Sequence, residues 1–127
     1  MLGSARLELP ANVEGLRGAR RFVAEHLQAW GYGSVASDAA LLTSELVTNA
    51  LRHASPPYAV EVVDLRDGIL VTVEDTGRSL PEARYPDADA VSGRGLAIVE
   101  SIAAAWGARP IPGQGKTVWF RLAAEDG

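Results

Sequence analysis

The residues best suited to chemistry are Glu45 and Asn49, which stand four positions apart in a segment of helical periodicity from Asp38 to about Ala54. Side chains at i and i+4 of a helix point the same way. Apolar residues surround the pair on nearly all sides, so this helix is predicted to be largely buried. A buried carboxylate is costly unless it is paired or lies in a solvated cleft, and such acids are often catalytic or metal-linked. The alternatives are a glutamate paired with an arginine and a helix face that looks out to solvent.

A second acid, Asp75, follows the apolar segment Val71–Val73 by two positions, and Gly77 comes two residues later. A carboxylate at the end of a strand can accept hydrogen bonds from a ligand's amino group, and a nearby glycine lets the backbone come close. The same Asp-x-Gly spacing also marks ordinary turns. From these residues alone, a ligand site and a turn are both open interpretations.

Glycines that suit phosphate binding stand in two places. Gly93, Arg94, Gly95 and Leu96 open a segment of helical spacing that runs from Gly95 to Trp106. Backbone N–H groups at the start of a helix, with the helix dipole behind them, bind anions, although the spacing here is neither the Walker nor the Rossmann pattern. Gly115-Lys116-Thr117 superficially matches a P-loop, but a strand rather than a helix follows it, so we reject that interpretation.

These groups must be positioned by a set of strands and helices that hydrophobic periodicity and turn signals predict. The expected strands are Ser4 to Leu9, Val60 to Leu65, Ile69 to Val73, Ala108 to Ile111 and Thr117 to Leu122. The expected helices are Asn12, as the cap, to about Trp30; Asp38, with Ser34 or Ser37 before it, to about Ala54; and Gly95 to Trp106, after a loop from Asp75 to Ser92. The sequence therefore predicts one α+β domain over residues 1–127, a two-layer sandwich of a mixed, mostly antiparallel sheet with about three helices on one face.

The composition excludes several classes of protein. A formal net charge of −4 argues against a protein that binds nucleic acid directly, because phosphate neutralisation needs clustered Lys and Arg. The chain has no cysteine, which rules out disulfides, zinc–thiolate sites and cysteine nucleophiles. No segment reaches the ~20 apolar residues of a membrane span, and the N-terminus has no signal-peptide pattern. We therefore expect a cytoplasmic protein with no membrane partner.

Taken in order, the four segments resemble the motifs of the Bergerat-fold (GHKL) ATPases, the group that holds histidine kinases, DNA gyrase and MutL. Glu45-x-x-x-Asn49 resembles the N box, Asp75-x-Gly77 the first glycine box, Gly93-x-Gly95-Leu96 the second, and Gly115-x-Thr117 the last motif, a threonine by the adenine. The stretch between the glycine boxes would be the ATP lid. The resemblance covers essentially the whole chain and is greatest to the single-domain anti-sigma-factor serine/threonine kinases, whose second helix reads like Leu42–Ala54.

The resemblance implies ATP and Mg²⁺ as cofactors and a role for each matching residue. Asn49 would ligate Mg²⁺, and Glu45 would be the general base that accepts the proton of the attacking serine hydroxyl. Asp75 would take the adenine amino group, which selects ATP over GTP, and Thr117 would support Asp75. Backbone amides would reach the nucleotide and its phosphates from Gly77, Gly93, Gly95 and Leu96.

Other residues depart from the family's pattern or keep two interpretations. Ser79 stands where the first glycine box often has a second glycine. Arg94 either reaches a phosphate or is solvated. Lys116, the one lysine of the chain, is expected on the surface, with a place near the site as the alternative. His53 is expected to be a neutral structural residue rather than a phosphoacceptor. Arg84 has no assigned role, and core packing is the expectation for Trp30, Trp106 and Trp119.

The resemblance implies a serine/threonine protein kinase that also acts as an anti-sigma factor. Such proteins bind a sigma factor, phosphorylate a serine of an anti-anti-sigma (STAS-type) partner and often form homodimers. The alternative, motivated by Ser79, is a sequestering module of the same fold that transfers no phosphate or binds no nucleotide. A detached histidine-kinase catalytic domain is less favoured, because the chain begins directly with a strand and helix of the anti-sigma type.

Overall fold

The computed structural model describes residues 3–53, 57–75, 102–111 and 115–124. Within these ranges two helices and five strands follow one another along the chain. They are β1 (Ser4–Leu9), α1 (Val13–Ala29), α2 (Gly33–His53), β2 (Tyr58–Asp64), β3 (Gly68–Asp75), β4 (Ala105–Ile111) and β5 (Gly115–Ala123). Neither helix is long and apolar enough to cross a membrane.

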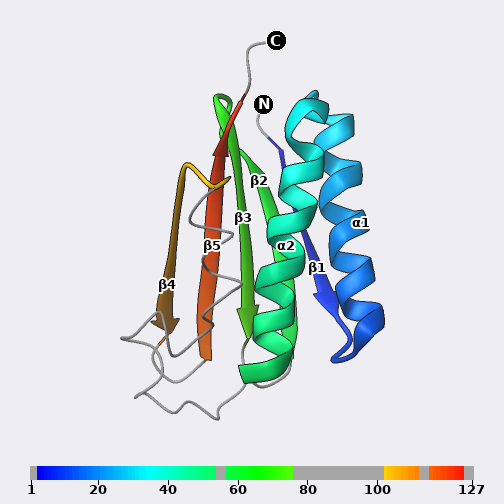
Figure 1. Ribbon diagram of the computed structural model, residues 1–127, viewed down its shortest axis with the longest axis vertical. Coiled ribbons are helices and arrows are strands. Elements are labelled where there is room, and N and C mark those ends of the chain that lie inside the picture. The colour runs from blue at the N-terminus through cyan, green and yellow to red at the C-terminus, as the bar shows by residue number, and fades with distance from the viewer. Residues whose placement is uncertain (1–2, 54–56, 76–101, 112–114, 125–127) are drawn as a thin grey trace.

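The five strands form one sheet in the order β1-β2-β3-β5-β4, and every neighbouring pair is antiparallel. Both helices lie against the same face of this sheet (Figure 1). The predicted two-layer α+β sandwich is confirmed. The sheet is wholly antiparallel within the described ranges rather than mixed. β2 and β3 pair as a hairpin, and the pairs β1–β2 and β3–β5, whose strands are far apart in sequence, are antiparallel as well.

The helix expected over Gly95–Trp106 lies mostly outside the described residues, and its predicted end is wrong. β4 begins at Ala105, so Trp106 belongs to a strand, where it pairs with Phe120 and packs against the core. A large aromatic residue suits a pleated, half-buried surface. The short apolar spacing before Gly107 could not separate the last turn of a helix from the entry into a strand.

Side-chain alternation along the strands separates a covered face of the sheet from an open one. In β3, Ile69, Val71 and Val73 are buried, while the residues between them are partly exposed. β5 repeats the pattern with Val118, Phe120 and Leu122. Successive side chains of a strand point to opposite faces, so the buried set lies under the helices. Together with the inner sides of α1 and α2 it forms a single apolar core.

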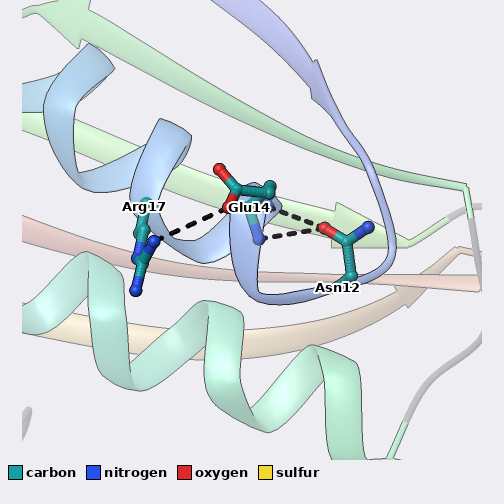
Figure 2. Close-up of polar contacts among 4 residues, drawn as sticks. Asn12, Glu14 and Arg17 are labelled. Carbon is teal, nitrogen blue, oxygen red and sulfur yellow. Dashed lines mark hydrogen bonds and ion pairs between the residues drawn. The ribbon is translucent and has the colours of Figure 1, made fainter.

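Asn12 starts α1 as predicted. Its side-chain oxygen accepts hydrogen bonds from the backbone N–H of Glu14 at 2.9 Å and of Gly15 at 3.3 Å (Figure 2). These bonds satisfy two of the donors that every helix leaves free in its first turn. Arg17 lies 3.6 Å from the Glu14 carboxylate, but both side chains are largely exposed, so this ion pair contributes little.

α2 starts at Gly33, five residues before the predicted Asp38 and one residue before Ser34, the earlier of the two predicted start signals. Gly31, with φ of 90°, turns the chain sharply between the helices, a conformation that glycine adopts without strain. The added first turns bury further small side chains against the core, those of Val35 and Ala36. The Tyr32 hydroxyl, just before the helix, donates a 2.7 Å hydrogen bond to Asp64, which raises the pKa of Tyr32 to about 12. This bond ties the helix layer to the end of β2.

Two glycines of α1 give a matched test of this packing. A Cβ at Gly15 would strike the carbonyl oxygen of Pro10, whereas a Cβ at Gly18 would meet nothing within 4 Å. We expect Gly18→Ala to raise the free energy of unfolding by about 0.8–1 kcal/mol through helix propensity. We expect Gly15→Ala to lower it by about 1–3 kcal/mol, because the chain must shift to relieve the clash. Urea unfolding of both variants measures this, and equal effects of the two would contradict the packing of α1 on the segment that follows β1.

Candidate functional site

The C-terminal end of α2, the end of β3 and the starts of β2 and β5 all lie at one end of the sandwich (Figure 1). Polar and charged side chains are buried at this end. Asn49 lies in the last turns of α2, Asp75 is the last residue of β3, and Lys116 is the second residue of β5; each is at most 5% exposed. Buried polar groups normally have partners, so their gathering where the core ends identifies the candidate site.

Asn49 presents a polar group to this end. The residue is 5% exposed, and its Nδ2 atom has no hydrogen-bond partner among the described residues. A buried donor without a partner costs about 1–3 kcal/mol, which a bound oxygen would offset. Rotation of the amide exchanges its nitrogen and oxygen, so the same place can also offer an oxygen to a hard cation such as Mg²⁺.

Glu45 lies one helical turn before Asn49 and is half-buried. The ion pairs between described side chains join Arg6 to Glu74 and Arg17 to Glu14, so the alternative of an arginine partner for Glu45 finds no support in the described ranges. The prediction that this part of α2 is largely buried is confirmed, although Leu41 is 41% exposed. The helix keeps one solvent-facing side, and Glu45 stands between that side and the core.

Asp75 is a strand residue, not a turn residue. It pairs with Tyr58 on one side and with Lys116 on the other. Gly115, with φ of 104°, lies against it: a Cβ there would collide with the Asp75 carbonyl oxygen and lie 2.6 Å from its Oδ1. Glycine at position 115 therefore leaves the room that this carboxylate occupies.

Tyr58 reports the environment of Asp75. Burial raises the pKa of the Tyr58 hydroxyl, and the negative charge of Asp75 raises it further. Both effects disfavour the phenolate, the first by loss of solvation and the second by repulsion between like charges. The charge of Asp75 therefore affects the ionisation of the Tyr58 hydroxyl, and both groups are buried.

Lys116 and Thr117 do not lie where the sequence predicted them: Lys116 was expected on the surface and Thr117 beside Asp75. Lys116 is 3% exposed, so its predicted place on the surface is wrong. Thr117 pairs with Glu74 rather than Asp75 and is half-buried on the open face of the sheet, beside Thr72 and Trp119. The structure does not bring Thr117 to Asp75. The alternation that buries Val118, Phe120 and Leu122 reaches Lys116 when it is continued toward the N-terminus, which is the signal that could have found it.

Of the predicted site residues, the structure places Asn49 and Asp75 at the same end, with Glu45 one turn away. Sequence reasoning assigned no site role to Tyr58, and it kept a place near the site for Lys116 only as the alternative. The other predicted contacts to the nucleotide lie outside the described residues: Gly77, Gly93, Arg94, Gly95 and Leu96. Ser79 and Arg84 lie outside them as well, as does the side chain of His53.

Comparison with known proteins gives two findings. The family model of the histidine kinase-like ATPase domain (HATPase_c_2) matches residues 9–122, a range that includes every helix and every residue of the site. A segment of 48 residues is 50% identical to "Blue-light-activated histidine kinase 2" of Erythrobacter litoralis (strain HTCC2594). That match covers 33% of the chain and 14% of the relative, so the chain corresponds to a small part of that protein.

Replacing Asp75 tests the burial and charge of this corner. We expect Asp75→Asn to lower the pKa of Tyr58, because the repulsive charge is gone, but not to its ordinary value near 10, because burial remains. Titration of ring-labelled tyrosine followed by NMR separates Tyr58 from the other tyrosines. Glu74→Gln, on the open face of the same strand, is the control and should leave the pKa of Tyr58 unchanged. An equal fall in both variants would place the carboxylate of Asp75 elsewhere.

Proposed function

The chain belongs to the histidine kinase-like ATPase domain family, and from this membership we propose that it binds Mg-ATP and transfers the γ-phosphoryl group to a serine or threonine of a protein partner. The observation that carries the proposal is the buried amide of Asn49, whose Nδ2 atom has no hydrogen-bond partner among the described residues, at the same end of the sandwich as the buried carboxylate of Asp75. The carboxylate of Asp75 is complementary to the amino group of a nucleotide base, and the amide of Asn49 is complementary to the phosphate oxygens.

The residues present fit a magnesium ion. Asn49 offers one neutral oxygen, and Mg²⁺ typically takes few protein ligands and keeps water and phosphate oxygens for the rest. Bound there with ATP, the ion would neutralise charge on the phosphates. The Nδ2 donor of Asn49, which has no partner among the described residues, would be satisfied by an oxygen of the bound phosphates or water.

Asp75 fits the base. An ionised carboxylate only accepts hydrogen bonds, so it favours the amino group of adenine and repels the keto oxygen that guanine has at the same place. The clearance provided by Gly115 keeps the carboxylate at the end of β3. Asp75 therefore selects ATP over GTP.

Glu45 is suited to the transfer step. It is half-buried on α2, one turn before Asn49, and has no arginine partner among the described ion pairs. As general base it accepts the proton of the attacking hydroxyl, while the phosphoryl group moves from ATP to the hydroxyl oxygen and ADP leaves. Such transfer relies on positioning and charge neutralisation.

The partners we propose are a sigma factor, which the protein sequesters, and an anti-anti-sigma protein of the STAS type, which it phosphorylates on serine in the cytoplasm. The similarity of Leu42–Ala54 to the second helix of anti-sigma-factor kinases supports this. A second candidate is transfer to a histidine, which the similarity to a histidine kinase favours. A module that binds partners without transfer is the third.

Asn49→Ala tests the nucleotide site. We expect the wild-type protein to bind ATP more tightly with Mg²⁺ than without it and to bind GTP at least about tenfold more weakly than ATP, a difference of about 1.4 kcal/mol. Asn49→Ala should remove the magnesium dependence. Thr48→Ala, which truncates the polar side chain directly before Asn49 in α2, is the control and should keep the magnesium dependence. Calorimetric titration measures each of these affinities, and no ATP binding by the wild type at millimolar concentration would refute the proposal.

Glu45→Gln tests the transfer step. The amide keeps the size of the side chain but accepts no proton, so ATP should still bind while transfer to the partner falls by about 100- to 10,000-fold. Labelled ATP and an anti-anti-sigma protein as substrate provide the assay. The label should be stable in acid, as phosphoserine is, whereas an acid-labile, alkali-stable product would indicate phosphohistidine and the second candidate. Unchanged transfer by Glu45→Gln would exclude Glu45 as the base.

A further inference from the structure

Lys116 is the one lysine of the chain, and it is 3% exposed. Lysine is almost never buried to this extent unless it is paired, because removing an ammonium from water is costly. Its long stem normally lets the charge reach solvent. The place of Lys116 in β5 therefore indicates a specific electrostatic role rather than packing.

Asp75 and Lys116 are the only buried charged side chains in the described part of the molecule. They have opposite sign, and they stand directly opposite each other in the antiparallel register of β3 and β5. Alternation places both on the face that the helices cover. Directly opposite residues of an antiparallel pair have Cβ atoms about 4.5–5.5 Å apart, a separation at which two such side chains interact strongly.

Among the described residues, the other neighbours of Asp75 carry no positive charge. Tyr58 faces it from β2 and is uncharged below its raised pKa. Gly115 lies against its Oδ1 atom and carries no side chain. On the nearby half of α2, Glu45 is half-buried and Arg52 is exposed, so the described cation that shares the burial of Asp75 is Lys116.

We propose that Lys116 is a positioning residue of the nucleotide site, whose ammonium compensates the charge of Asp75 and orients that carboxylate to accept a hydrogen bond from the amino group of adenine. This role rests on the proposed function. A carboxylate has about four lone-pair positions, so it can hold the ammonium on one side and the amino group of the base on another. Lys116 thereby acts on base selection through Asp75 and not by contact with the phosphates.

The test compares ATP with inosine triphosphate, which has a keto oxygen in place of the adenine amino group. We expect Lys116→Met, which keeps the stem and removes the charge, to weaken ATP binding by about tenfold or more and to affect inosine triphosphate little, because only ATP uses the oriented carboxylate. Arg121→Met, a loss of one positive charge from an exposed position of the same strand, is the control and should change neither affinity.

A double-mutant cycle separates positioning from general damage. In the Asp75→Asn background, Lys116→Met should weaken ATP binding no further, because the carboxylate through which it acts is absent. Independent, additive losses would overturn the proposal, as would a loss confined to inosine triphosphate, which would mean that the ammonium contacts the base directly. If Lys116→Met alone does not fold, the double variant with Asp75→Asn should fold, because no uncompensated buried charge remains in it. Failure of the double variant to fold would also overturn the proposal.

The outcome for the wild-type protein keeps the two proposals distinct. Absence of ATP binding by the wild type overturns the proposed function and this role together. ATP binding by the wild type with the same ratio of ATP to inosine triphosphate affinity in Lys116→Met overturns only the role of Lys116.

Discussion

The pairing of β3 with β5 is the interaction on which the rest of the structure depends. It joins strands far apart in sequence, and its register decides which side chains of each strand face the helices. A shift of one residue would exchange the two faces of a strand: Lys116 and Phe120 would turn outward, and Thr117 and Trp119 would turn toward the core. The apolar alternation of both strands opposes that shift, so the same hydrophobic burial that stabilises the sheet also fixes Lys116 opposite Asp75.

Apolar packing also positions the residues of the site that lie on the helix layer. α2 contributes a buried stripe that includes Leu42, Leu46 and Ala50, all part of the one core. Asn49 lies at the end of this stripe, where apolar packing gives way to polar groups from three strands. Because the stripe fixes the rotation of α2 about its axis, it also fixes the directions of Asn49 and Glu45. The Nδ2 atom of a residue so placed has no hydrogen-bond partner among the described residues, which leaves this atom available to a ligand.

How much of this could be predicted depended on whether the signal was local. The cap at Asn12 and the strand Ser4–Leu9 follow from neighbouring residues and are found as predicted. The start of α2 was missed because small residues after Gly33 carry a weak periodic signal, and only contact with the core decides their state. The prediction for Lys116 was wrong because it relied on the residue type, since lysine is usually exposed. The alternation of buried and exposed positions along β5 instead places residue 116 on the buried face. Its partner, Asp75, was predicted as a site residue, but nothing in the sequence states that the two strands are neighbours.

The site therefore has two halves of different mechanical character. The half that holds Asp75 and Lys116 is built on adjacent strands of the sheet, whose cross-strand bonds and buried faces keep both residues fixed in relation to each other. The half that holds Glu45 and Asn49 lies on a single helix, whose position relative to the sheet is set by side-chain packing alone. Under the proposed function, Asp75 on the sheet would determine which base is accepted, whereas Glu45 and Asn49 on the helix would determine whether the phosphates are held in a geometry that permits transfer. Base selection and transfer would then be separable, and substitutions in the sheet and in the helix would affect them independently.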